Sequence, residues 1–500
     1  MRGKIMNYTK FAVKGAVIVF VVSLLAAFLG YLVRLVLARN LTVEDFGLFY
    51  SVFAFLSLVT IFKTFGFDRA LIKFIPEFIH NKRNDFIKSS MIYISMLLFI
   101  TNVVIIIAIY LLSKYLSIHF FHNEKASVVL NVMAIAFFAE TFVNVFKFSF
   151  QGFQKMYLYS SIDIVRMIIV LSVAVVGFKL NCGIMGPVAG YAAAPFILLI
   201  LYGILFFKKV FPQFSSSSLI FNKILLRDIS KYSFFIMATG AGVIILGYPD
   251  MMFLTYFSGV KEVALYSIAL PTAKILIYFP SAISSILLPL TSELWTKKRY
   301  ALLKDGMESL YKFSMIVAIP LVFVMMSFTN LLITVFFSAN YVNAAGALKI
   351  LSIGMLFLTI HMINVNFFLG IGKPQIQTKI VYLAGAFNVA ADLVMIPILG
   401  VTGAAIAATA SYFIMMAFGL IKVNKFIDIK LPIGIWIKTL LAGAAFILII
   451  SAMKSIINLN VWLETSIVVG AAGIFYAAML FLFRILSIRE LKEVYRRVTG

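Results

Sequence analysis

The side chains of this sequence that could do chemistry are charged residues inside long apolar stretches. Of the 500 residues, 63% are hydrophobic and only 12% are charged. A charge at the centre of a bilayer costs about 2.5–3.5 kcal/mol on insertion scales, so a charged residue retained there indicates a substrate or ion site. Lys274, Glu140 and Arg166 lie deepest in their apolar stretches, counted at 1.5 Å per helical residue. Buried Lys and Arg would pair with phosphate, which compensates their desolvation.

Other charges lie nearer the ends of their stretches. Arg34 is close to the outer end of the first apolar stretch, and Lys63 is close to the inner end of the second. At such positions a long side chain can snorkel to the interface, which is a simpler explanation than a binding role. Asp250 and Asp392 lie about 10 Å from the outer face. We predict a substrate cavity formed by Arg34, Lys274, Asp250, Arg166 and Lys63. We predict that any ion coupling uses Glu140, Asp250 or Asp392.

Structural roles for the same residues stay open. Asp163 and Arg166 are three residues apart on one helix, so they could form a self-neutralising pair. Glu140 could pair with a cation on another helix. His119 and His122 have the spacing of metal ligands, but no third ligand is evident, so we expect no metal site. The phosphate-binding glycine loop of ATPases is absent, and we expect neither enzymatic activity nor a cofactor.

The elements that position these residues are membrane-spanning helices. Mean hydropathy is +1.06, and apolar stretches long enough to cross about 30 Å of hydrocarbon recur along the chain. We predict an all-α membrane protein with fourteen transmembrane helices. They cover residues 12–38, 46–66, 87–112, 126–150, 157–178, 184–207, 231–257, 262–290, 309–335, 343–369, 376–398, 402–421, 433–453 and 461–483.

The chain repeats itself at an offset of about 217 residues, and such self-similarity indicates a duplicated unit. Residues 260–266 match residues 43–49, residues 400–403 match 183–186, and Gly370 and Lys373 match Gly152 and Lys155. Six helices separate the copies, so both enter the membrane from the same side. We predict two parallel six-helix lobes, related by a pseudo-twofold axis along the membrane normal, plus two C-terminal helices.

The charges predict the orientation. The net charge is +24, and most of the 43 Lys and Arg residues fall in segments on the N-terminal side of the predicted membrane. Cytoplasmic loops carry such an excess, so we expect both termini in the cytoplasm and no role in nucleic-acid binding. The predicted domains are an N-lobe (1–207), a cytoplasmic linker rich in Ser and Pro (208–230), a C-lobe (231–421), and helices thirteen and fourteen with a cytoplasmic tail (422–500). Residues 67–79 have the pattern of an amphipathic surface helix.

Four segments resemble a known family. They are ARNLTVEDFGLFYSV (38–52), FPSAISSILLPLTSEL (279–294), GIGKP (370–374) and GVTGAAIA (400–407). They resemble the polysaccharide flippases of the multidrug/oligosaccharidyl-lipid/polysaccharide exporter superfamily. The resemblance implies a cell-membrane flippase that moves a polyprenyl-(pyro)phosphate-linked oligosaccharide to the outer leaflet. It further implies a cavity lined by helices one, two, seven and eight, which carry Arg34, Lys63, Asp250 and Lys274.

Three alternatives remain. A lipid II flippase of the same superfamily has further cavity arginines in its first helix, where this chain has Arg34 alone. An ion-coupled multidrug antiporter usually has twelve helices and an acidic cavity. A membrane glycan polymerase or ligase would need a large outer loop, and the predicted outer loops are short. As partners we expect the lipid-linked oligosaccharide, membrane lipids, a coupling Na⁺ or H⁺ and glycan-biosynthesis enzymes, and we expect a monomer.

Overall fold

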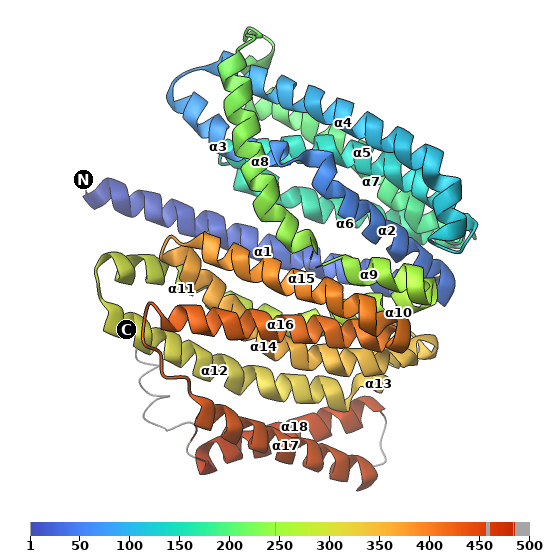
Figure 1. Cartoon of the computed structure of the whole chain (residues 1–500), viewed down its shortest axis with the longest axis vertical. Coiled ribbons are helices and arrows are strands. Elements are labelled where there is room, and N and C mark those ends of the chain that lie inside the picture. Colours follow the sequence, from blue (N-terminus) through green and yellow to red (C-terminus); the bar gives the residue numbers. More distant parts are fainter. Residues whose placement is uncertain (1, 246, 457–460, 484, 486–500) are drawn as a thin grey trace. The chain divides into compact units, whose positions relative to one another are not determined.

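The computed structural model describes residues 2–245, 247–456, 461–483 and 485 (Figure 1). Throughout these residues the regular elements are helices, with no strand. Eleven helices in the described part are long and apolar enough to cross a membrane. The chain is therefore an all-helical, multi-pass membrane protein, while the count of fourteen helices stays a prediction. Most of the predicted cytoplasmic tail, residues 486–500, lies outside the described residues.

The predicted spans seven and eight are not continuous helices. Span seven is divided into α8 (Lys223–Ile245), α9 (Pro249–Phe253) and the π-helical turn η3 (Leu254–Ser258). Span eight is divided into α10 (Val260–Lys274), the 3₁₀ turn η4 (Ile275–Ile277) and α11 (Tyr278–Thr296). Proline at position 249 begins α9, and Pro280 is the third residue of α11, four residues after Leu276 of η4. Proline removes a helix hydrogen bond and clashes with the carbonyl four residues earlier, which explains an interruption in the turn before each proline.

The chain divides into two compact units after Ala264, and α10 crosses this boundary. The N-terminal unit contains α8 and α9 in addition to the first seven helices. Those helices are α1 (Arg2–Asn40), α2 (Val43–Thr64), α3 (Phe67–His80), α4 (Asn84–His119), α5 (Lys125–Gly152), α6 (Met156–Lys179) and α7 (Met185–Leu205). Helix α7 packs against α5 and α6, α1 packs against α6, and α8 contacts α2, α3 and α4 (Figure 1).

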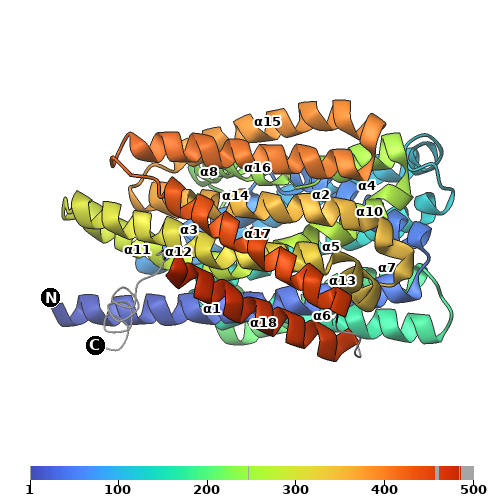
Figure 2. The same cartoon turned by 90° about the horizontal axis from the view of Figure 1, so that it is seen from below.

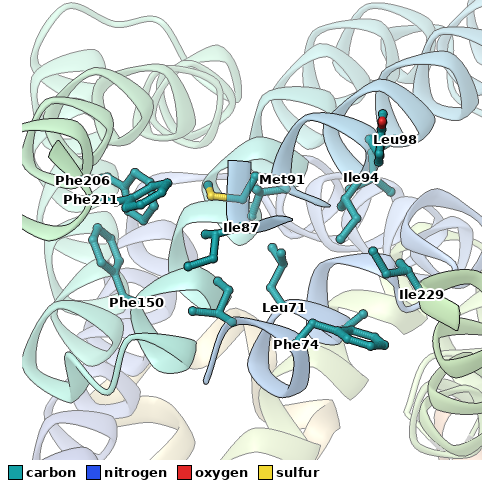
Figure 3. Packing of buried hydrophobic residues seen from close by; sticks show 14 of the residues in the cluster. Leu71, Phe74, Ile87, Met91, Ile94, Leu98, Phe150, Phe206, Phe211 and Ile229 are labelled. Carbon is teal, nitrogen blue, oxygen red and sulfur yellow. The ribbon is translucent and has the colours of Figure 1, made fainter. Parts of the chain in front are cut away.

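The short helix α3 is amphipathic, as its sequence predicts, but its apolar face is covered by protein. Leu71, Phe74, Ile75 and Phe78 are buried against α4, α5 and α8. Figure 3 shows Leu71 and Phe74 in the same apolar cluster as Ile87 of α4, Phe150 of α5 and Ile229 of α8. Burial of large apolar side chains is the main stabilising contribution to such packing, so α3 is a built-in part of the N-terminal unit.

The C-terminal unit begins at Leu265. Its further elements are α12 (Tyr300–Ser327), α13 (Thr329–Phe336), η5 (Ala339–Ala344), α14 (Ala345–Gly370), α15 (Pro374–Leu399), α16 (Val401–Asn424), α17 (Ile433–Ile456) and α18 (Val461–Leu482). Helix α16 packs against α14 and α15, and α17 packs against α12 and α18 (Figure 2). A separate apolar cluster holds the last two helices to α12, where the Tyr476 hydroxyl donates to the Ile316 carbonyl at 2.9 Å.

The two units share turns with the same backbone hydrogen bonds. After α5, the Lys155 amide donates to the Phe150 carbonyl at 2.8 Å, and after α14 the Lys373 amide donates to the Phe368 carbonyl at 2.9 Å. Both turns contain a residue with positive φ, Gln154 in one and Gly372 in the other. The Arg83 and Arg299 amides form a second matching pair, each donating to the carbonyl five residues earlier at 2.9 Å.

Close helix contacts are repeated too. A Cβ atom added to Gly152 would lie 2.9 Å from the Leu71 carbonyl oxygen, and one added to Gly370 would lie 3.0 Å from the Leu288 carbonyl oxygen. The two glycines match each other in the sequence repeat, and so do the two leucines. These equivalent contacts support the duplication, whereas the parallel arrangement of two lobes stays a prediction.

Candidate functional site

An ion-pair network joins α5 and α6 in the N-terminal unit. The Arg166 guanidinium lies 2.5 Å from the Glu140 carboxylate and 3.8 Å from the Asp163 carboxylate. The Lys147 ammonium also pairs with Asp163, at 2.7 Å from its carboxylate. Glu140 therefore pairs with a cation on another helix, and Asp163 and Arg166 form the i,i+3 pair that their spacing allows. Both structural interpretations of these residues hold in the same network.

Lys63, at the end of α2, is buried rather than snorkelling. Its side chain is only 4% exposed, and its ammonium donates a hydrogen bond to the Phe137 carbonyl of α5. The ammonium also lies 4.9 Å from the centre of the Phe137 ring, a cation–π distance. The snorkelling interpretation is therefore wrong, because α5 supplies an acceptor that position along α2 does not reveal.

Two neutral residues that sequence reasoning missed complete this part of the unit. The Asn102 amide of α4 donates to the Lys63 carbonyl at 3.0 Å, and the Thr141 hydroxyl of α5 donates to the Asn102 side-chain oxygen at 3.1 Å. Both residues are buried. A buried amide needs hydrogen-bond partners, so an asparagine in the middle of an apolar span was the available signal.

Asp68, in the first turn of α3, adds a third carboxylate near Lys63. It is 4% exposed, and its carboxylate accepts a hydrogen bond from the Arg69 amide at 2.9 Å. Burial raises the pKa of Asp68, partly opposed by the Arg69 amide and by the positive charges of Arg69 and Lys63. The six groups comprise three bases and three acids, namely Lys63, Lys147, Arg166, Asp68, Glu140 and Asp163. Their formal charges cancel.

Arg34 of α1 lies outside this network, on a column of aromatic rings. Its guanidinium carbon is 4.5 Å from the centre of the Tyr50 ring in α2. Neighbouring ring centres along the column are 5.2–5.7 Å apart, in the order Tyr50, Phe49, Tyr191, Phe53 and Phe137. Since Lys63 stacks on Phe137, the column has a cation at each end. Stacking on an aromatic face fixes the orientation of a guanidinium.

The N-terminal unit also contains Asp250, at the break in span seven. It is 2% exposed and follows Pro249 in the first turn of α9. A carboxylate is stabilised at the start of a helix, where unpaired amide groups carry partial positive charge. Nearby, the Thr255 hydroxyl of η3 lies 3.1 Å from the Ser51 hydroxyl of α2 and donates to the Met251 carbonyl at 2.6 Å.

Lys274 occupies the corresponding break in span eight, in the C-terminal unit. It is the last residue of α10, before the 3₁₀ turn η4, and it is half-buried. A cation is favourable at this end of a helix because the last carbonyl groups carry partial negative charge. The Gly-Tyr-Pro run at 247–249 and Pro280 were the sequence signals for the two breaks. Lys349 of α14 is exposed.

Asp392 of α15 is the predicted carboxylate of the C-terminal unit. It is fully buried, and it accepts a hydrogen bond from the Asn388 amide, one turn earlier, at 2.8 Å. Two other buried polar contacts of this unit join neutral groups, namely Tyr311 to Asn364, and His361 to Gln377 at 2.9 Å. In the described part of the chain, no three His, Cys, Asp or Glu residues come together as metal ligands.

The predicted site residues are thus distributed over both units. Arg34, Lys63, Glu140, Arg166 and Asp250 belong to the N-terminal unit. Lys274 and Asp392 belong to the C-terminal unit. The structure joins Glu140 to Arg166 directly, and it places Asp250 and Lys274 at helix interruptions.

Comparison with known proteins gives concordant matches. Residues 12–295 match the family model described as polysaccharide biosynthesis protein, and residues 236–394 match the MatE family model. An uncharacterized membrane protein of Methanocaldococcus jannaschii is 32% identical over 99% of both chains. A probable low-salt glycan biosynthesis flippase of Haloferax volcanii is 20% identical over 54% of this chain and 58% of its own.

A solved structure of the lipid II flippase MurJ, in an inward closed conformation, has the same fold. The TM-score is 0.75 at 13% sequence identity, over 94% of this chain and 100% of the flippase. The family match covers more than half of the chain, and the relative from M. jannaschii covers nearly all of it. The chain therefore belongs to the polysaccharide biosynthesis protein family, the polysaccharide-flippase branch of the multidrug/oligosaccharidyl-lipid/polysaccharide exporter superfamily.

Proposed function

We propose that this protein is a flippase for a lipid-linked oligosaccharide. It would move a glycan carried on a polyprenyl (pyro)phosphate from the cytoplasmic to the outer leaflet by alternating access of two lobes. Family membership supports this proposal, as does the relative from H. volcanii that is named a glycan biosynthesis flippase. The protein would act as a monomer in the cell membrane, with both termini in the cytoplasm, beside the enzymes that assemble the glycan.

The observation that carries the proposal is the interruption of spans seven and eight at charged residues. Asp250 lies in the first turn of α9, and Lys274 is the last residue of α10. Irregular backbone at membrane depth is tolerated where it is buried in protein or lines a water-filled cavity. Transporters use such broken helices to bind polar substrates and ions near the middle of the membrane. A lipid-borne phosphate needs cations at that depth, and Lys274 is in a suitable position.

The other predicted cavity residues divide by their contacts. Arg34 stacks on the Tyr50 ring, and a guanidinium is a favourable partner for phosphate. Lys63 donates to the Phe137 carbonyl, and Arg166 pairs with Glu140. We propose that Lys63 and Arg166 hold the cavity wall of the N-terminal unit, and that Arg34 and Lys274 meet the phosphate.

The same reasoning ranks the candidates for ion coupling. Glu140 is within a network whose formal charges cancel, so it has little attraction left for a Na⁺ ion. Asp392 is fully buried and accepts a hydrogen bond from the Asn388 amide. Burial disfavours the charged form of a carboxylate, so uptake of H⁺ or Na⁺ would offset part of the cost of burying this group. We propose Asp392 as the coupling carboxylate, with Asp250 as the alternative.

Transport in proteoliposomes tests the proposal. The probe is a fluorescent disaccharide on a polyprenyl diphosphate, and the measurement is its loss from the inner leaflet. We expect Lys274→Ala to lower the rate at least about tenfold, since it removes a charge-assisted contact worth about 1.5–3 kcal/mol. Lys274→Arg should keep part of the rate. Lys349→Ala, which removes an exposed lysine of the same unit, is the matched control.

An unchanged rate in Lys274→Ala, in protein that is folded by its melting curve, would refute the assignment of Lys274. No transport of the probe by the unaltered protein would refute the proposed substrate class. The match of residues 236–394 to the MatE model favours an ion-coupled multidrug antiporter as the second candidate. Accumulation of a cationic dye in the same vesicles, driven by a Na⁺ or H⁺ gradient, would support that candidate instead.

A further inference from the structure

The N-terminal unit has an apolar groove between α4, α5 and the chain that follows α7. Its volume is about 390 Å³, within the range of 300–1,000 Å³ that ligand pockets usually have. We call it the α4–α5 groove. It is lined by Met91, Ile92, Ser95, Met96, Phe99, Ile100, Phe142, Val145, Phe146, Phe207 and Phe214. Ser95 is the one lining residue with a polar side chain, so the chemistry of the groove suits a hydrocarbon chain.

The length of the groove matches one leaflet of a bilayer. Along α4 it extends from Met91 to Ile100, which is about 14 Å at 1.5 Å per residue. Half of a typical hydrocarbon core is about 15 Å. Met96, Phe99 and Ile100 are exposed, while Met91 is buried at the edge of the cluster with Phe206 and Phe211 (Figure 3). The groove therefore has a packed floor and an open side.

One end of the groove is basic. Lys208 and Lys209 follow the lining residue Phe207 in the π-helical turn η1 (Phe206–Val210), and both are exposed. The Lys88 ammonium lies 5.2 Å from the centre of the Phe214 ring, which closes the same end. The Phe207 and Phe214 rings are 4.8 Å apart. Three lysines thus adjoin the residues at this end of the groove: Lys208 and Lys209 follow Phe207 in the chain, and Lys88 lies against the Phe214 ring.

We propose that the α4–α5 groove binds one anionic phospholipid of the membrane. One hydrocarbon chain would lie along α4, and the phosphate would lie among Lys88, Lys208 and Lys209. Polybasic segments next to a membrane attract anionic lipids in this way. This site is distinct from the proposed substrate cavity, because it uses α4, α5 and η1 rather than the residues around Arg34 and Asp250.

The bound lipid would also stabilise the segment between η2 (Pro212–Phe214) and α8, within the N-terminal unit. Phe214 lies on η2, at the start of the segment that leads to α8. That segment is fastened to α4 by the Ser218 amide, which donates to Asp85 at 2.6 Å, and by Tyr93, which donates to the Ile220 carbonyl at 2.5 Å. Lys88 donates to the Ser217 carbonyl at 2.8 Å. A lipid phosphate beside Lys88 would add to this attachment.

Native mass spectrometry of the full-length protein in detergent tests the proposal. We expect dioleoylphosphatidylglycerol to give one saturable adduct at concentrations where dioleoylphosphatidylcholine gives none. Each lysine near an anionic lipid contributes about fivefold in affinity, so Lys208→Gln with Lys209→Gln should weaken the adduct about 25-fold. The control pair Lys297→Gln and Lys298→Gln also removes two adjacent exposed lysines and should leave it unchanged.

A second variant tests the groove separately from the charges. Ser95→Phe places a ring in the groove and should abolish the adduct while the melting temperature without lipid stays the same. Equal binding of the two lipids, or equal loss in the control pair, would show ordinary surface lipid and overturn the proposal. Displacement of phosphatidylglycerol by an equimolar amount of undecaprenyl phosphate would overturn it too, because the groove would then be a site for the carrier lipid.

Discussion

The N- and C-terminal units differ in the kind of polar group that they bury. The N-terminal unit gathers three bases and three acids whose charges cancel, with Arg166 and Glu140 at the centre. In the C-terminal unit the buried Tyr311 and Asn364 form a neutral pair, and the buried carboxylate of Asp392 accepts from the Asn388 amide. Two units with matching turns and helix contacts have therefore acquired different interiors. Shared backbone geometry does not specify which polar groups are buried.

The largest expected effect comes from breaking the ionic network. Arg166→Ala should lower the free energy of unfolding by about 2–3 kcal/mol, because it leaves Glu140 without its strongest partner. A fully buried pair would cost about 3–5 kcal/mol, and each side chain here keeps nearly a fifth of its surface exposed. Denaturant unfolding in detergent measures the change. The double variant Glu140→Ala with Arg166→Ala should recover part of the loss, and strict additivity would contradict the coupling.

The exposed pair Lys297 and Glu293 gives a control for that experiment. Both side chains are more than half exposed, and Lys297 lowers the pKa of Glu293. Exposed pairs usually contribute about 0–1 kcal/mol, so Lys297→Ala should change the unfolding free energy little.

The repeated glycine contacts should give the next largest effect, and a similar one in both units. Gly152→Ala would place a methyl group against the Leu71 carbonyl, and Gly370→Ala would place one against Thr291 and the Leu288 carbonyl. Overpacking of this kind costs about 1–3 kcal/mol. Melting temperatures of the two variants measure it. Gly346, whose added Cβ would meet nothing within 4 Å, is the control position. A large loss in one variant alone would contradict the equivalence of the contacts.

The neutral interior of the C-terminal unit should be less sensitive to loss of a partner. Tyr311→Phe removes the hydroxyl that donates to Asn364, and a lost buried hydrogen bond costs about 1–2 kcal/mol. Denaturant unfolding of Tyr311→Phe and Arg166→Ala under the same conditions compares the two units directly. A larger loss of unfolding free energy in Tyr311→Phe than in Arg166→Ala would contradict the expected order.

The smallest expected effect depends on pH. Burial raises the pKa of Asp68, so the folded state favours the protonated carboxyl. The stability that this group contributes is present below its unfolded pKa of about 3.9 and is lost as pH rises through the folded pKa. Asp68→Asn should therefore raise the melting temperature at pH 7 and change it little at pH 4. Equal shifts at the two pH values would show that ionisation of Asp68 does not matter.

The sequence by itself determined that the protein is an all-helical membrane protein of this family with an internal repeat. These features follow from properties of contiguous residues, namely apolar stretches, helical rise and matching motifs such as those at Gly152 and Gly370. Two of its charged candidates, Glu140 and Arg166, are partners in the structure. The interruptions next to Asp250 and Lys274 could have been found from Pro249 and Pro280, because proline disturbs the helical turn just before it in the same segment.

The tertiary structure alone decided which polar groups meet. Lys63 is buried because α5 presents the Phe137 carbonyl to it, and Asn102 and Thr141 join it from α4 and α5. Distance along one helix gives the depth of a residue, but it gives neither the rotation nor the identity of the neighbouring helix. Those depend on the packing of many side chains at once, which is why a snorkelling lysine and a buried one look alike in the sequence.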